Sequence, residues 1–129
     1  MEKDKSVLII DDDFSLQQTL AQIFEQEGFK VSTACINLSA LELVRTNSFA
    51  LVVMDLNVYN DYGLSLFFKL KYRFPELPII TLSSSLAQDP DTLAVTEKSW
   101  FNLLKPVPPK IIVEMALDLI NAQIGLEIP

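Results

Sequence analysis

Apolar and polar positions follow two patterns along this chain. Short runs rich in apolar residues predict five β-strands, at residues 7–10, 29–34, 50–54, 78–82 and 100–104. In the first run all four residues are apolar, although successive side chains of a strand point to opposite faces. We expect such a strand to be covered on both faces, as in a parallel sheet.

Between these strands, apolar residues recur at helical spacing. The first stripe consists of Leu16, Leu20, Ile23 and Phe24, and Gly28 is placed to end that helix. Further helices are predicted from Asn37 or Ser39 to residue 46, over 64–73, within 89–98 and over 109–120. Strands that alternate with helices predict an α/β fold, a (βα)5 doubly wound five-stranded parallel sheet.

The length and net charge of the chain limit the number of domains and the kinds of partner that it can have. A chain of 129 residues with 50% hydrophobic residues fits a single domain, residues 1–129, with a sizeable core. Lys and Arg total 10 against 17 Asp and Glu, a formal net charge of -7 at pH 7. This balance argues against a nucleic-acid-binding surface and favours protein partners.

Cysteine and histidine usage restrict the chemistry further. Cys35 is the single cysteine, so no internal disulfide can form, and the sequence shows neither a signal peptide nor a membrane span. We therefore expect a cytoplasmic protein without membrane association. The chain contains no histidine, which excludes Ser-His-Asp and Cys-His catalysis as well as histidine-ligated metals.

Polar residues follow four of the predicted strands. Asp11, Asp12 and Asp13 come directly after the first strand. Asp55 follows the third strand, Ser83 the fourth and Lys105 the fifth. Because ligands bind at the carboxyl ends of parallel strands, we expect these residues to form one site. Adjacent carboxylates repel one another, and their oxygens suit Mg²⁺. One carboxylate can then attack phosphorus, while a lysine and a hydroxyl hold the phosphoryl oxygens.

Four motifs in order resemble the receiver domains of two-component response regulators. They are "VLIIDDD", "ALVVMDLN", "LPIITLSS" and "LLKP", and they span essentially the whole chain. The resemblance implies a flavodoxin-like fold with strand order 2-1-3-4-5. It also implies that the chain could be the N-terminal part of a longer regulator.

The resemblance assigns roles to individual residues. Asp55 would accept the phosphoryl group, with Ser83 as the switch hydroxyl and Lys105 as the phosphate-contacting lysine. The Mg²⁺ site would comprise Asp11, Asp12, Asp55 and the backbone carbonyl of Asn57. Asp13 would cap the following helix, and the Lys105-Pro106 peptide bond would be cis.

The same resemblance implies the partners. The phosphoryl group would come from a sensor histidine kinase or a histidine phosphotransfer protein, and the domain would catalyse only its own phosphorylation and dephosphorylation. The face made by helix 4, strand 5 and helix 5 would contact an output domain or a second copy. Asn102 stands where the family has its signalling aromatic residue, and we expect the neighbouring Trp100 and Phe101 to pack under the last helix.

Two other functions stay open at this point. A phosphatase of the haloacid dehalogenase type would use Asp11 as nucleophile and Asp13 as acid, because "DDD" contains D-x-D after a buried strand. That enzyme would leave Asp55 without a role. A pseudo-receiver would bind proteins without being phosphorylated, which the missing aromatic favours and the intact acidic pair opposes.

Overall fold

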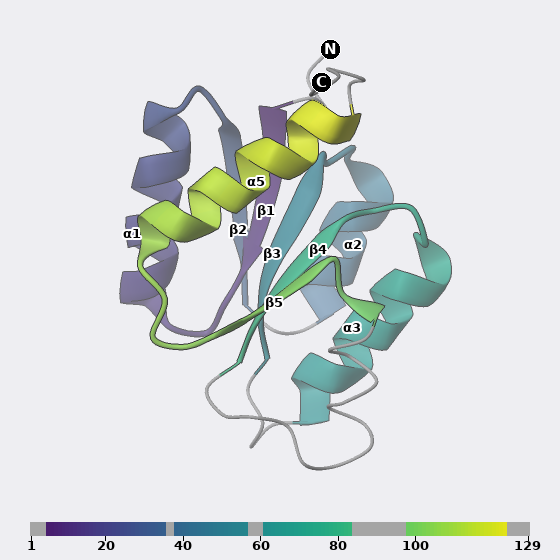
Figure 1. The fold of residues 1–129 in the computed structure, drawn as a ribbon. Coiled ribbons are helices and arrows are strands. Elements are labelled where there is room, and N and C mark those ends of the chain that lie inside the picture. Colours follow the sequence, from purple (N-terminus) through teal and green to yellow (C-terminus); the bar gives the residue numbers. More distant parts are fainter. Residues whose placement is uncertain (1–4, 36–37, 57–60, 84–97, 124–129) are drawn as a thin grey trace.

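A computed structural model describes residues 5–35, 38–56, 61–83 and 98–123. Its five strands are parallel and lie in the order β2-β1-β3-β4-β5 (Figure 1). Their bounds are β1 Ser6–Ile10, β2 Lys30–Ala34, β3 Leu51–Leu56, β4 Ile79–Ser83 and β5 Phe101–Leu104. The predicted doubly wound sheet and its strand order are confirmed.

Helices cover both faces of this sheet. They are α1 Phe14–Gln26, α2 Leu38–Thr46, α3 Asp61–Arg73 and α5 Pro109–Gln123. In Figure 1, α1 and α5 lie on one face, and α2 and α3 lie on the other. The central strands β1, β3 and β4 are thus enclosed, which explains why they are apolar at successive positions.

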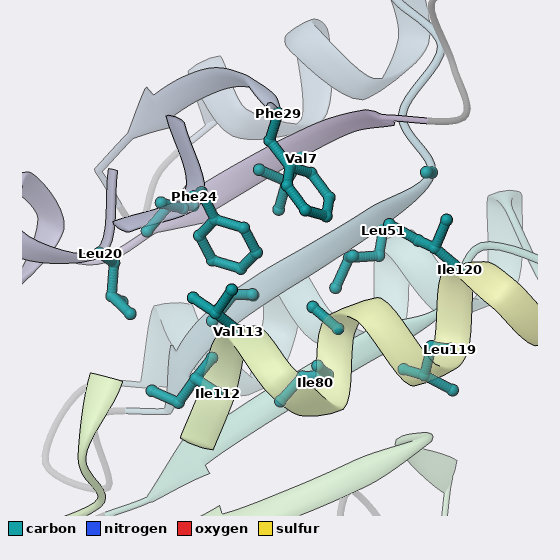
Figure 2. Close-up of a cluster of buried hydrophobic side chains, with 14 of the residues drawn as sticks. Val7, Leu20, Phe24, Phe29, Leu51, Ile80, Ile112, Val113, Leu119 and Ile120 are labelled. Carbon is teal, nitrogen blue, oxygen red and sulfur yellow. The ribbon is translucent and has the colours of Figure 1, made fainter. Parts of the chain in front are cut away.

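The core under α1 and α5 combines two aromatic rings with aliphatic side chains from the sheet and from α5 (Figure 2). The rings of Phe24 and Phe29 meet edge to face, with centroids 4.9 Å apart. Leu20 and Phe24 are fully buried, and each such side chain contributes about 1.5–3 kcal/mol through burial. This packing holds α1, and with it the segment that leads from β1 into α1.

Local signals in the sequence explain the ends of α1. Asp13 is its N-cap, with an extended backbone and a carboxylate that accepts the N–H of Leu16 at 3.1 Å. Gly28 follows the helix at φ +89°, a conformation that disfavours any residue with a Cβ atom. Both the Asp13 cap and the Gly28 stop are confirmed.

Several boundaries differ from the prediction. Ser39 lies inside α2, so its assignment as the helix cap is wrong, and Asn37 lies outside the described residues. The helix predicted within residues 89–98 also lies outside them, apart from Lys98. Within the described ranges, no helix has both the length and the apolar character that crossing a membrane requires.

Trp100 and Phe101 are more exposed than expected. Their side chains are 43% and 36% exposed, so the expectation that both pack under the last helix is wrong. The reason is their place at the sheet edge, since β5 pairs with β4 on one side and is the last strand of the sheet. From β5, Leu103 joins the core beneath α5 instead.

Candidate functional site at the carboxyl edge of the sheet

Parallel strands bring the predicted site residues to one edge of the sheet. Asp11 directly follows β1, Asp55 is the second-last residue of β3, and Ser83 is the last residue of β4. Lys105 directly follows β5. The pairing of Leu56 with Ser83, and of Ser83 with Leu104, keeps these strand ends level. Residues separated by up to 94 positions, from Asp11 to Lys105, therefore share one edge.

Asp55 and Lys105 form an ion pair. The Nζ atom of Lys105 lies 2.7 Å from Oδ1 of Asp55, and the side chains are 28% and 12% exposed respectively. The backbone N–H of Lys105 donates to the carbonyl of Ser83 at 2.7 Å, which continues the pairing of β5 with β4. The Lys105-Pro106 bond is cis, as the resemblance implied. Asp55 thus presents a partly accessible carboxylate beside a fixed ammonium group.

Asp11 is buried, with 2% of its surface exposed. Its Oδ1 atom accepts the N–H of Asp13 at 2.8 Å, whereas Oδ2 is buried and accepts no hydrogen bond from any described group. Burial raises the pKa of this carboxyl to about 6, the N–H of Asp13 opposes that rise, and the charge of Asp55 adds to it. A carboxylate oxygen in this situation calls for a positive partner.

Asp12 and Asp13 are exposed beside Asp11. One carboxylate oxygen of Asp13 accepts the hydrogen bond that caps α1. Of the three carboxylates after β1, those of Asp11 and Asp12 are therefore better suited to bind a cation. Ser83 is 3% exposed at the end of β4. Asn57, whose carbonyl the resemblance assigns to the metal, lies outside the described residues.

The donor set fits Mg²⁺. Its ligands in proteins are hard oxygens, usually one or two carboxylates together with water and phosphate oxygens. The buried Oδ2 atom of Asp11, with no hydrogen-bond donor among the described groups, meets that requirement, and Asp12 adds a second carboxylate. The described residues contain no group of three acidic, cysteine or histidine side chains arranged to hold a metal. The protein thus contributes part of a coordination shell, to be completed by other oxygens.

Gln17 is a residue of this site that the sequence reasoning missed. It lies in the first turns of α1 and is 6% exposed, and its Nε2 atom donates to the carbonyls of Asp11 at 3.0 Å and Ala34 at 3.1 Å. The available signal was its position, because Gln17 precedes Leu20 and Phe24 on the buried stripe of α1. A polar residue on a buried stripe needs hydrogen-bond partners.

A second unforeseen contact joins β4 to β5. The hydroxyl of Thr81, which is fully buried, donates to Oδ1 of Asn102 at 2.8 Å. The two residues are direct neighbours in the sheet, on the face that carries Ser83 two residues further along β4. Asn102 therefore has a defined polar partner at the position where the resembling family has an aromatic residue.

The fold and the site together define a class of protein. A five-stranded parallel sheet in the order 2-1-3-4-5, with acidic residues, a serine and a lysine at its carboxyl edge, is the arrangement of receiver-type signalling domains. The chain matches the response regulator receiver domain family over residues 7–117, and it belongs to that family. It is therefore a signalling domain of two-component systems.

Individual relatives agree with this assignment. The alginate biosynthesis transcriptional regulatory protein AlgB of Pseudomonas aeruginosa is 27% identical over 108 residues, which are 84% of this chain and 24% of AlgB. A response regulator of Burkholderia pseudomallei, whose crystal structure has a phosphorylated aspartic acid, a calcium ion and citrate, is 29% identical with a TM-score of 0.72. That match covers 97% of this chain and 75% of the other.

The fold itself matches a receiver domain protein of Methanospirillum hungatei, with a TM-score of 0.83, 23% identity, and coverage of 95% of this chain and 98% of that one. This chain spans about a quarter of the length of the curated relatives that it matches. The comparisons give no support to a haloacid dehalogenase-type phosphatase or to a pseudo-receiver.

Proposed function

We propose that Asp55 accepts a phosphoryl group from a sensor histidine kinase or a histidine phosphotransfer protein. The observation that carries this proposal is the ion pair of Asp55 with Lys105, 2.7 Å long, at the end of the central strand β3. Asp55 is partly exposed, whereas Asp11 is buried with one oxygen already engaged. Of these carboxylates, Asp55 is the one that is both accessible and paired with a lysine, which favours it as the nucleophile toward phosphorus.

The transfer is a displacement at phosphorus. A carboxylate oxygen of Asp55 bonds to phosphorus while the phosphorus–nitrogen bond of the donor phosphohistidine breaks. The imidazole nitrogen keeps the electron pair of that bond and takes up a proton. Phosphoryl transfer depends mainly on positioning and on stabilising the charge of the equatorial oxygens, so little other covalent chemistry is required.

The neighbouring residues supply that stabilisation. The Lys105 ammonium group, which pairs with Asp55 before transfer, holds a phosphoryl oxygen afterwards, and the Ser83 hydroxyl holds another. Asp11, Asp12, Asp55 and the Asn57 carbonyl would hold Mg²⁺. When bound, this ion offsets the carboxylate repulsion and the negative charge of the phosphoryl oxygens. The Burkholderia relative, with its phosphorylated aspartic acid and calcium ion, supports such a site here.

The wider role follows from this chemistry. We propose that the domain catalyses only its own phosphorylation and dephosphorylation, and that it acts in the cytoplasm, where a free cysteine such as Cys35 stays reduced. The formal charge of -7 supports protein partners rather than direct nucleic-acid binding. Side chains exposed on β5 and α5, namely Phe101, Leu104 and Ile111, support docking of an output domain or a second copy on the face around β5.

Phosphorylation with a small donor tests the proposal. The protein is incubated with acetyl phosphate and Mg²⁺, and its intact mass is measured. We expect the mass to rise by one phosphoryl group in the wild type and in Asp13→Asn, because Asp13 caps α1, and to stay unchanged in Asp55→Asn. Phosphorylation of Asp55→Asn, or failure of the wild type with acetyl phosphate and with a phosphorylated histidine phosphotransfer protein, would overturn the proposal.

A further inference from the structure

Gln17 connects the first turns of α1 to the ends of two strands. The backbone N–H of Gln17 donates to the carbonyl of Asp13 at 3.0 Å, so the residue is fixed within the helix directly after the acidic segment. Its side chain points to the sheet edge and donates to the carbonyls of Asp11 and Ala34. One buried amide thus joins β1, β2 and α1 at the start of the candidate metal site.

The polar groups of Asp11 show what this amide controls. The N–H of Asp11 donates to the carbonyl of Ala34 at 3.0 Å, and its Oδ1 atom accepts the N–H of Asp13. The carbonyl of Asp11 accepts from Gln17. Three of the four polar groups of Asp11 are therefore fixed by the protein, and Oδ2 is the buried atom that accepts no hydrogen bond from a described group.

The position of the Asp11 carbonyl also affects the backbone orientation of Asp12. This carbonyl belongs to the planar peptide unit that joins Asp11 to Asp12, so the hydrogen bond from Gln17 restrains the rotation of that plane. That plane includes the N and Cα atoms of Asp12. Its orientation therefore influences the direction in which the Asp12 side chain leaves the backbone. A single buried amide therefore helps to fix the peptide unit that links the two residues with these carboxylates.

We propose that Gln17 is a positioning residue for the cation site, which aims the carboxylates of Asp11 and Asp12 at one ion by holding the peptide plane between them. This inference rests on the proposed function, since it needs Mg²⁺ to bind at these carboxylates. Some residues do not bind the metal themselves but form hydrogen bonds to its ligands. Removing such a residue typically lowers metal affinity by about 10–100-fold. Gln17 takes this role here through its two carbonyl contacts.

The test compares Mg²⁺ affinity with stability in three variants. Gln17→Met keeps the approximate shape of the side chain and removes both donors. Gln18→Met makes the same change at the neighbouring exposed glutamine, and Leu20→Ala destabilises α1 from the core without touching the acidic segment. Each nitrogen-15-labelled protein is titrated with Mg²⁺ while the amide chemical shifts of residues 11–13 are followed, and thermal unfolding is measured alongside.

A positioning role predicts that Gln17→Met weakens Mg²⁺ binding about tenfold, while Gln18→Met and Leu20→Ala bind like the wild type. Wild-type affinity in Gln17→Met, or equal weakening in Gln17→Met and Leu20→Ala, would overturn the inference and leave the proposed function intact. A wild type without any Mg²⁺-dependent shift would overturn both. If Gln17→Met does not fold, Gln17→Asn, whose amide is one methylene too short to reach both carbonyls, takes its place with the same criteria.

Discussion

Asp11 shows how one residue can lower the stability of the domain while it prepares the site. Its carboxyl is buried, accepts one hydrogen bond from Asp13, and has a pKa raised to about 6. A carboxyl with a raised pKa in the folded state favours folding while it is protonated and opposes folding once it is ionised. At neutral pH the folded protein therefore carries a buried negative charge beside Asp55, which a bound cation would offset.

Replacing Asp11 by Asn should stabilise the cation-free protein at neutral pH. Asn keeps an oxygen for the N–H of Asp13 and removes the buried charge. The favourable contribution of the wild-type carboxyl is complete below pH 3.8 and is lost as pH rises through about 6. We predict that the free energy of unfolding of Asp11→Asn exceeds that of the wild type by about 1–3 kcal/mol at pH 8, and by less at pH 4.

Urea unfolding at pH 4, 6 and 8 in the presence of a chelator measures this difference. Asp118→Asn, an exposed position on α5, serves as the control and should leave the free energy of unfolding nearly unchanged at each pH. A wild type as stable as Asp11→Asn at pH 8, or a gain that does not grow between pH 4 and pH 8, would contradict this account of Asp11.

Lys105 should matter for phosphoryl transfer more than for cation binding. Its ammonium group lies 2.7 Å from Asp55, on the other side of the predicted phosphoacceptor from the Asp11 and Asp12 carboxylates. Lys105→Met removes one fixed charge from the transferring group, so we predict phosphorylation by acetyl phosphate to be about 10²-fold slower at saturating Mg²⁺. Lys110→Met, on the exposed side of α5, is the control, and an unchanged rate in Lys105→Met would exclude the proposed role.

At the scale of the elements, the sequence was sufficient to place the strand ends. The continuous apolar runs of β1, β3 and β4 predict enclosed parallel strands, and the polar residues that follow them then have to share an edge. The contacts of Gln17 and Thr81 could not be predicted in the same way. The Gln17 contact depends on which turn of α1 lies beside the Asp11 carbonyl. The Thr81 contact depends on the register of β4 with β5. Apolar periodicity predicts neither of these.

The contact of Thr81 with Asn102 leads to a prediction about β5. A buried hydroxyl that donates to Asn102 ties β5 to β4 beside Ser83, and no bulky side chain occupies position 102. We expect amide exchange at residues 101–104 to change only slightly when beryllofluoride and Mg²⁺ are added, and residues 83–98 to change most. Thr81→Val, which removes the hydroxyl and keeps the shape, should increase exchange at residues 101–104 in both states.

Hydrogen exchange followed by mass spectrometry measures these changes, with Thr33→Val on the exposed part of β2 as the control. A large change at residues 101–104 of the wild type, together with no effect of Ser83→Ala, would mean that the signal passes through β5 and Trp100. Equal exchange in Thr81→Val and the wild type would show that the hydroxyl does not hold β5.

At the scale of the whole molecule, sheet topology brings distant chain segments into one chemical site. The order β2-β1-β3-β4-β5 places the Asp55 strand at the centre, between the strand that leads to the acidic residues and the strand that ends in Ser83. Lys105 reaches Asp55 from beyond β4 with its long side chain.

Chemical mapping of the phosphorylated residue tests the central claim most directly. The protein is phosphorylated with acetyl phosphate and Mg²⁺ and then reduced with borohydride, which converts a phosphorylated aspartate into homoserine, and its peptides are sequenced by mass spectrometry. Our account predicts homoserine at position 55, and unmodified aspartate at positions 11, 12 and 13. Homoserine at position 11, with aspartate intact at position 55, would contradict it.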